Sequence, residues 1–223
     1  MEHPINVSML LGMDFSHKFW HVTMTFLVVM IVLFLGSLAK KKDAEVPGRT
    51  QNALELFVKG VYNMCDDVMG VEGRPYIPLI FGIGLYVAFS NVLGLIPGFL
   101  APTSNLNSTV APALVVFGVY NYIGIKRHGA GYIKHFLGPV AWLAPLMLII
   151  EIIGHLARPL SLSMRLFGNI FGEDLVIIIL FMLVPFVVPL PMFMLGLFTS
   201  LLQAYVFMML SMIYISGALE EAH

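Results

Sequence analysis

Apolar stretches far longer than those of soluble proteins alternate with short polar segments along this chain. Residues 19–39, 75–125 and 175–219 contain no Asp, Glu, Lys or Arg. A helix needs about 20 apolar residues to cross the hydrocarbon core of a bilayer. The first stretch therefore predicts one membrane span over 19–39, and the second is long enough for two.

The second stretch predicts a helical hairpin over 76–125. Its apolar run is interrupted at Pro97 and again by the polar segment 103–109, and irregular backbone of this kind cannot face lipid. We therefore expect two spans, over about 76–96 and 109–125, joined by a loop outside the membrane.

Residues 136–219 predict a pair of long membrane helices, because a proline-rich break from Pro185 to Pro191 divides them. The first segment, of about 45 residues, is too long for one vertical span, so it must tilt strongly, bend, or begin on the membrane surface. The chain is therefore expected to be an all-α polytopic membrane protein with about five membrane helices. All of residues 1–223 would form a single integral membrane domain.

Residues 50–69 have the pattern of an amphipathic helix. Their apolar and polar side chains fall on opposite sides of a helical wheel, as in a helix that lies on a membrane surface. A soluble connector helix packed on protein would show the same pattern, so this alternative stays open. The apolar side is formed by Leu54, Phe57, Val58, Val61, Cys65 and Val68, and the polar side by Glu55, Lys59, Asn63, Asp66 and Asp67.

Two basic clusters predict the orientation of the chain in the membrane. Three lysines (40–42) follow the first span, and Lys126 and Arg127 follow the hairpin. Positively charged residues are enriched at the cytoplasmic ends of membrane helices. We therefore expect the N-terminal segment 1–18 outside, and the surface helix and the C-terminus on the cytoplasmic side. No transit peptide is visible, which favours the plasma membrane of a bacterium.

Composition narrows the classes of function. Hydrophobic residues make up 59% of the 223 residues and charged residues only 11%, against about 25% charged residues in soluble domains. These values exclude a disordered chain and a soluble domain, and they leave no basic face for a nucleic acid. The single cysteine, Cys65, cannot form an intramolecular disulfide. No metal-ligand spacing or P-loop is present, so we expect no cofactor.

The chemistry is expected in the first long helix of the pair, which carries five charged residues. At membrane depth each charged group costs at least about 2.5–3.5 kcal/mol to insert, so these groups should face a water-filled path or a protein partner. On a helical wheel, most polar groups of this segment share one stripe about 80° wide. The stripe contains Glu151, His155, Arg158, Arg165, Asn169 and Glu173, with Leu162 interrupting it, Ser161 just outside it and Asp174 well off it.

Two explanations of this stripe remain open. Glu151 and Arg158 could form a buried ion pair that holds the helix in place, with His155 beside them. Arg165 fits this explanation less well, because its nearest acids on the stripe are two turns away, and a lone arginine suits a partner in trans. On the last helix, Gln203 lies among uncharged hydrogen-bonding residues, whose spacing alone favours a role in helix packing.

Several segments resemble subunit a of the F-type ATP synthase, in order along most of the chain. The most specific is Ser161–Glu173, with the sequence SLSMRLFGNIFGE. Leu202–Phe207 resembles the second signature of that family, and Asn91–Pro97 with Thr103–Thr109 resembles its earlier hairpin.

The resemblance implies a stator beside a rotating ring of c subunits, each with a carboxylate in the membrane. Two aqueous half-channels would reach the ring from opposite sides, and Arg165 matches the arginine that separates them. Its charge favours the ionised ring carboxylate, so an arriving carboxyl group releases its proton, and it opposes direct proton passage between the half-channels. Gln203 and Asn169 match a glutamine and an asparagine near this arginine. Glu151 and Ser161 match an acidic and a small polar position before it.

Two positions need separate comment. The family's second acidic position lies nine residues after the arginine, which is Asp174 here, whereas the stripe selects Glu173; both are kept as candidates. Some relatives have a histidine seven residues before the glutamine, where this chain has Gly196. Whether His155 substitutes for that histidine stays open.

The implied partners are the c-subunit ring, b-type peripheral stalk subunits, the lipid bilayer and a translocated ion, H⁺ or alternatively Na⁺. The chain would not be an enzyme by itself. A secondary ion-coupled transporter is the alternative, but such proteins often have repeated halves, and no repeat is detectable here. A membrane-embedded enzyme would need a nucleophile, a metal site or an acid/base pair in a closed pocket, and no such constellation stands out.

Overall fold

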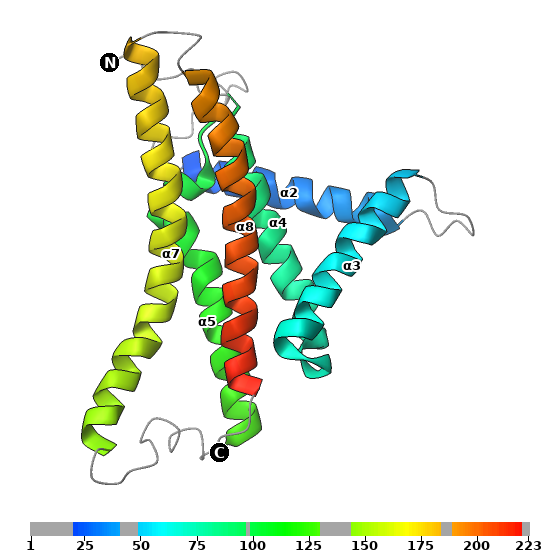
Figure 1. The fold of residues 1–223 in the computed structure, drawn as a ribbon, viewed down its shortest axis with the longest axis vertical. Coiled ribbons are helices and arrows are strands. Elements are labelled where there is room, and N and C mark those ends of the chain that lie inside the picture. The colour runs from blue at the N-terminus through cyan, green and yellow to red at the C-terminus, as the bar shows by residue number, and fades with distance from the viewer. Residues whose placement is uncertain (1–19, 41–48, 97–98, 130–143, 184–188, 220–223) are drawn as a thin grey trace.

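The computed structural model describes residues 20–40, 49–96, 99–129, 144–183 and 189–219, and every regular element in them is helical (Figure 1). This confirms the predicted all-α fold. The elements are α2 (Trp20–Lys40), α3 (Arg49–Met69), the 3₁₀ helix η2 (Val71–Tyr76), α4 (Ile77–Gly94), the 3₁₀ helix η3 (Pro102–Ser104), α5 (Leu106–His128), α7 (Ala144–Leu183) and α8 (Pro189–Leu219).

Four helical segments among the described residues are long and apolar enough to cross a membrane. The apolar part of α2, Trp20–Phe34, is shorter. Together they agree with the prediction of a polytopic protein with about five membrane helices. The four long segments are Val71–Gly94 (η2 with α4), Leu106–Arg127 (in α5), Pro145–Leu183 (in α7) and Leu190–Leu219 (in α8).

Some predicted features lie outside the described residues. They are the outer segment 1–18, the lysines at 41 and 42, the interruption at Pro97, residues 136–143, the start of the proline-rich break at Pro185, and residues 220–223. The end of that predicted break, from Pro189 to Pro191, belongs to α8, which begins at Pro189. Pro191 therefore lies in the first turn of α8, where the N–H group that proline lacks would have no partner within the helix.

The connection between α4 and α5 is more compact than the predicted loop. The second helix begins at Leu106, because the side chain of Asn105 accepts a hydrogen bond from the Asn107 N–H (3.0 Å) and caps the helix. The backbone also returns against α4, since a Cβ at Gly94 would overlap Ala101. Thr103, within η3, is fully buried. The polar segment 103–109 is thus partly a 3₁₀ turn and partly the first turn of α5.

The two long helices cannot both stand upright with α2 in one bilayer. At 1.5 Å per residue, the 40 residues of α7 extend for about 60 Å, whereas the hydrocarbon core is about 30 Å thick. Figure 1 shows α7 and α8 running along the long axis of the molecule and α2 lying crosswise to them. Because α7 is about twice as long as the hydrocarbon core is thick, it must tilt strongly or extend beyond the core. Pro159 lies inside α7 and interrupts the hydrogen bonding of that helix, and Figure 1 shows that the first part of α7 diverges from α8.

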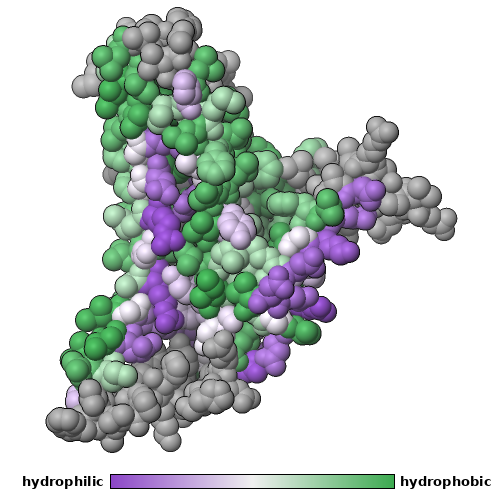
Figure 2. Space-filling model, viewed as in Figure 1, coloured by the Kyte–Doolittle hydropathy of each residue, from purple (hydrophilic) through white to green (hydrophobic). Residues whose placement is uncertain are grey.

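Helix α3 agrees with the predicted amphipathic helix in both bounds and polarity. Val61, Cys65 and Met69 are buried in a cluster with residues of α4, α5 and α8, and the Ser216 hydroxyl of α8 donates to the Val68 carbonyl (3.0 Å). Phe57 remains 52% exposed. The C-terminal half of α3 therefore packs on protein, and its N-terminal half keeps an apolar surface beside the polar side chains seen in Figure 2.

Two ion pairs tie the corner between α3 and α4 to its neighbours. Arg74 donates to both carboxylate oxygens of Asp66 (2.9 and 2.8 Å), and Arg127 of α5 pairs with Glu72 of η2. The Arg74 guanidinium holds the pKa of Asp66 below its usual value. Beside this pair, burial raises the pKa of the Cys65 thiol. Asp66, Glu72 and Arg74 belong to the polar segment between the first predicted span and the hairpin, and each is held in an ion pair.

A second core cluster fixes the middle of α7 against three other helices. Leu162 and Leu166 of α7 are buried against Val87 of α4, Val116 of α5 and Phe207 of α8. Leu162 is the apolar residue that interrupts the predicted polar stripe. Its burial shows that this face of α7 packs against the core cluster at that position. Fixing these two leucines also fixes the direction in which their neighbours on α7 face.

Candidate functional site

Arg165 lies beside this core cluster, near the middle of α7. Its side chain is exposed, and no hydrogen bond or ion pair links it to another described residue. Its neighbours Leu160 and Met164 are also exposed and apolar. A positive charge on an apolar face needs a partner of opposite charge when it enters a membrane. Among the described residues, Arg165 thus has no partner of opposite charge.

Asn169 and Gln203 link the two long helices next to Arg165. The Asn169 Nδ2 donates to the Gln203 Oε1 at 2.8 Å. Gln203 is only 2% exposed, and its Nε2 is buried without a hydrogen-bond partner among the described residues. The spacing of α8 favoured a packing role for Gln203, and this bond does join the helices. This bond uses only the amide oxygen of Gln203, however, and its Nε2 donates no hydrogen bond to a described residue. Buried donors of this kind are rare unless water or another group accepts the hydrogen bond.

Glu173 reaches toward α8 two turns beyond Arg165. The Thr199 hydroxyl donates to its Oε2 (3.0 Å), and its carboxylate occupies the space that a Cβ at Gly196 would fill. The other oxygen, Oε1, is buried and has no hydrogen-bond partner within the described chain. Asp174, the other candidate, makes no hydrogen bond or ion pair to a described residue. Glu173 can therefore adopt this position only because residue 196 is a glycine.

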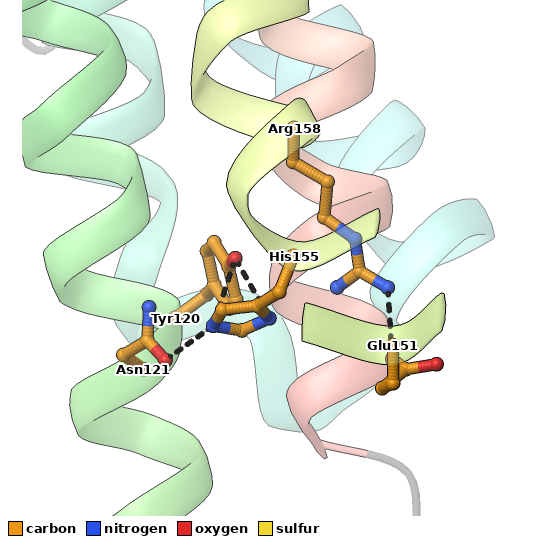
Figure 3. A network of polar contacts seen from close by, with 5 residues as sticks. All are labelled: Tyr120, Asn121, Glu151, His155 and Arg158. Carbon is orange, nitrogen blue, oxygen red and sulfur yellow. Dashed lines mark hydrogen bonds and ion pairs between the residues drawn. The ribbon is translucent and has the colours of Figure 1, made fainter. Parts of the chain in front are cut away.

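A third polar group lies on the opposite side of Arg165, between α5 and α7 (Figure 3). His155 Nε2 is 2.7 Å from Asn121 Oδ1, and the Tyr120 hydroxyl lies 3.2 Å from His155 Nδ1. Arg158 is 3.8 Å from Glu151, and its guanidinium lies over the ring of Tyr120. The ion pair expected between Glu151 and Arg158 is therefore present, but it is half-exposed and loose rather than buried.

Ser161 does not join any of these groups. It is exposed on α7, whereas its neighbour Ser163 is buried and donates to the Leu160 carbonyl (3.0 Å). The structure thus brings the predicted site residues together in three places. Asn169 and Gln203 lie next to Arg165, Glu173 lies toward one end of α7, and Glu151, His155 and Arg158 lie toward the other end.

Several polar residues near the site were not found by sequence reasoning. Thr199 binds Glu173, while Tyr120 and Asn121 bind His155, and all three lie on a different helix from their partner. In the connection between α4 and α5, the Thr103 hydroxyl of η3 donates to Asn91 Oδ1 of α4 (2.7 Å), and both residues are buried. Three more buried atoms there and on α8 lack a hydrogen-bond partner among the described residues: Asn91 Nδ2, Ser90 Oγ and Ser200 Oγ. A helical wheel treats one helix at a time, so it cannot reveal contacts between helices.

Together, the fold and the site define a polytopic α-helical membrane protein that carries charged and hydrogen-bonding groups along the seam of two tilted helices. Figure 2 shows a line of hydrophilic side chains beside α7 and α8, flanked by apolar side chains, and a second hydrophilic band over α3. Among the described residues, no group of three or more His, Cys, Asp or Glu side chains could hold a metal ion.

Comparison with known proteins assigns the family. The family model described as ATP synthase A chain matches residues 22–216. ATP synthase subunit a 3 of Pelobacter propionicus is 55% identical over 202 residues, which are 91% of this chain and 88% of the relative. ATP synthase subunit a of Geobacter sulfurreducens is 52% identical over the same shares of both chains. The chain belongs to the ATP synthase subunit a family.

Proposed function

We propose that this chain is the stator of the membrane sector of a bacterial F-type ATP synthase, and that it conducts ions to and from a rotating ring. Membership of the subunit a family supports the coarser statement, that of a multi-pass subunit of the membrane sector. The finer proposal is that the chain contains two aqueous half-channels, which end on either side of Arg165. The chain itself would not be catalytic.

One observation carries the finer proposal: Arg165 lies between two separate polar groups. At 1.5 Å per residue, Glu173 is about 12 Å from Arg165 along α7, and Glu151 is about 21 Å away in the other direction. Between these groups the core cluster of Leu162 and Leu166 closes the helix interface with apolar side chains. Two polar paths separated by an apolar seal and one fixed charge are the features that two half-channels require.

The first path is proposed to run between α4, α7 and α8. Glu173, Ser200, Gln203 and Asn91 each contribute a buried atom with no hydrogen-bond partner among the described residues. A buried polar atom without a partner loses the free energy of hydration, and ordered water commonly compensates that loss. Water among these groups would complete their hydrogen bonds and provide a route for protons. Asp174 stays a second candidate for this path, because it lies next to Glu173 on α7.

The second path is proposed to start at the basic end of α5 and to pass Glu151 and His155. Under the positive-inside rule this end faces the cytoplasm, which places the N-terminus outside and the path of Glu173 on the outer side. An ion would enter by one path, cross with the ring carboxylate, and leave by the other. A membrane potential of 100 mV supplies about 2.3 kcal/mol for each charge that crosses.

Arg165 is proposed to control the exchange between these paths. Arginine supplies a fixed positive charge in proteins, and Arg165 has no acid partner among the described residues. A ring carboxylate that arrives beside it is stabilised in the ionised form, so a bound proton is released. The same fixed charge repels a proton that would pass directly from one path to the other. The c-subunit ring is therefore the proposed partner at α7, and H⁺ or Na⁺ the proposed ion.

The peripheral stalk and the transporter alternative need different evidence. Stalk subunits of the b type are proposed as further partners on the basis of family membership alone.

A self-sufficient secondary transporter finds no support in the comparisons, since the relatives are named as subunits of a synthase. Co-purification with a small hydrophobic ring protein and a soluble ATPase would support the stator, and isolation as an autonomous carrier would contradict it.

Disulfide crosslinking tests the proposed contact with the ring. Gly168 lies one turn from Arg165 on α7 and has open space around it, so a cysteine fits there. With Cys65 replaced by alanine, Gly168→Cys should form a disulfide with a cysteine placed beside the ring carboxylate. Gly118→Cys on α5, where a side chain also has open space, is the matched control and should not react. Crosslinking of Gly118→Cys but not of Gly168→Cys would contradict the proposal.

A further inference from the structure

A groove separates α3 from α4 beyond the corner that joins them. Gly70 follows α3 with a φ of +66°, a conformation that suits glycine and lets the backbone turn sharply. From this corner the two helices diverge (Figure 1). The groove has a volume of about 210 Å³ and is partly open. Its walls are formed by Val58, Val61 and Tyr62 of α3 and by Ile77, Pro78 and Phe81 of α4.

The side chains that line the groove are apolar except for the Tyr62 hydroxyl. Val61 and Ile77 are buried, whereas Tyr62 remains 41% exposed. The rings of Phe57 and Phe81, whose centroids are 5.8 Å apart, connect the two helices beside the groove. An enclosed apolar cavity of about 150 Å³ stays dry and takes up benzene. A groove of this volume and polarity therefore favours hydrocarbon over water.

The groove borders the hydrocarbon of the membrane. Its α4 wall belongs to a segment that is long and apolar enough to cross a bilayer, and its α3 wall belongs to an amphipathic helix. In this half of α3, Leu56 and Phe57 are 74% and 52% exposed, and such apolar side chains normally enter the boundary of the acyl chains. A further helix is about 10–12 Å wide with its side chains, too wide for this groove, whereas a single acyl chain fits.

A basic residue lies at the rim of the groove. Lys59 precedes Tyr62 by one turn of α3, so the two side chains are neighbours on the helix surface. Lys59 is exposed and makes no hydrogen bond or ion pair to a described residue. Basic residues near a membrane surface attract anionic lipid headgroups, and the long lysine stem can cover apolar surface while its charge stays at the headgroups. The phosphate of a glycerophospholipid supplies the complementary charge.

We propose that the groove binds a glycerophospholipid, with one acyl chain between Val58 and Phe81 and the phosphate beside Lys59. The acyl chain covers apolar side chains of α3 that the described part of the chain leaves exposed. The bound lipid thus anchors the N-terminal half of α3 to α4. Neither Arg165 nor the identity of the translocated ion enters this proposal, so it is independent of the proposed function.

Photochemical crosslinking in the whole complex identifies the occupant of the groove. Tyr62→p-benzoylphenylalanine keeps an aromatic ring at the groove and adds a photoreactive ketone. The complex is reconstituted into vesicles of phosphatidylethanolamine and phosphatidylglycerol, extracted with a mild detergent and irradiated, and its peptides are analysed by mass spectrometry. A phospholipid adduct at position 62 is expected, because a lipid bound in the groove survives extraction. An adduct with another subunit, an adduct with detergent only, or no adduct would overturn the proposal.

Two tryptophan substitutions on α3 distinguish a lipid in the groove from lipid that adheres elsewhere. In the photoreactive background, Val58→Trp fills the groove and should abolish the phospholipid adduct. Leu56→Trp is the matched control, because Leu56 is exposed on the same helix but does not line the groove, and it should leave the adduct yield unchanged. Equal yields in the two variants would show that the lipid does not occupy the groove.

Substitution of Lys59 tests the contact with the phosphate. Lys59→Gln should weaken retention of the phospholipid about fivefold, which is the effect of one basic residue near anionic headgroups, and Lys59→Arg should retain it as wild type does. Both substitutions are on the exposed face of α3, so they decide the matter if Val58→Trp does not assemble. Equal retention in Lys59→Gln and Lys59→Arg would overturn the proposal.

Discussion

Asn169 on α7 donates through Nδ2 to Gln203 Oε1 on α8, and this 2.8 Å bond joins the two long helices one turn from Arg165. The bond leaves Gln203 Nε2 buried and without a partner among the described residues. Gln203 therefore has both a contact that joins the helices and a buried donor with no partner among the described residues. The two roles predict different consequences of substitution.

Replacing Gln203 with leucine should affect ion flow far more than stability. The side chain has similar volume, and the substitution removes an unpaired donor together with the hydrogen bond, so the free energy of unfolding should change by no more than about 1 kcal/mol. Passive proton flow per assembled complex should fall severalfold. Ser211→Ala is the control, because the Ser211 hydroxyl bonds only within its own helix, to the Phe207 carbonyl. Equal flow in both variants would count against a functional role for Gln203.

Gly196→Ala should destabilise the protein even though alanine favours helices. A Cβ at position 196 would overlap the Glu173 carboxylate, and overpacking of this kind costs about 1–3 kcal/mol. Adding Glu173→Ala to the same chain should relieve part of the loss, because the Cβ would also lie 2.7 Å from Leu95 Cδ2. Gly118→Ala, at a helical glycine with open space around it, should be neutral or stabilising by up to about 1 kcal/mol. Thermal unfolding of the complex in detergent measures all three, and independent effects of the two substitutions would contradict the predicted overlap.

Cys65 should react slowly with maleimides in the folded protein. It is fully buried where α3 packs on α4, α5 and α8, and burial raises the pKa of its thiol, which leaves less of the reactive thiolate at neutral pH. Asn63→Cys, on the exposed face of the same helix and in a Cys65→Ala background, should label rapidly. Denaturation should make the two cysteines equally reactive. Fast labelling of native Cys65 would show that α3 does not pack as described.

The ion pair between Asp66 and Arg74 should stabilise the corner after α3 in a pH-dependent manner. The pKa of Asp66 is lowered from its ordinary value of 3.8 in the folded protein by Arg74. The stabilisation is therefore fully present above that ordinary value and is lost as the pH falls below it, through the folded-state pKa. Wild type should unfold at a higher temperature than Asp66→Asn at neutral pH, and the difference should vanish in acid. A difference that grows as pH falls would have the wrong sign for this pair.

The helices could be predicted from the sequence because their lengths and charge-free stretches reflect the bilayer directly. Arg49–Met69 differs by a single residue from the predicted helix 50–69. The polar segment 103–109 predicts a loop and a start of α5 at about residue 109, whereas Asn105 caps a helix that begins at Leu106. Polar residues within an apolar stretch can mark a break, but they can also begin a helix.

The site could be predicted within one helix but not between helices. Periodicity places Arg165 and Glu173 on one face of α7, and it correctly pairs Glu151 with Arg158. It gives no information on Thr199 or Tyr120, which lie on other helices and reach the site only through the fold. The resemblance to a known family supplied Gln203, which periodicity alone interpreted as packing.

The most direct measurement of the central proposal is coupled ATP synthesis in Arg165→Ala. Leu160→Ala, at an exposed apolar position one to two turns earlier on α7, is the matched control for assembly. The amount of assembled complex should equal that of wild type in both variants, because Arg165 makes no hydrogen bond or ion pair to the described residues. We expect Leu160→Ala to synthesise ATP and Arg165→Ala to have no synthesis driven by an ion gradient. Normal synthesis in the assembled Arg165→Ala complex would contradict the proposal that this arginine separates two half-channels.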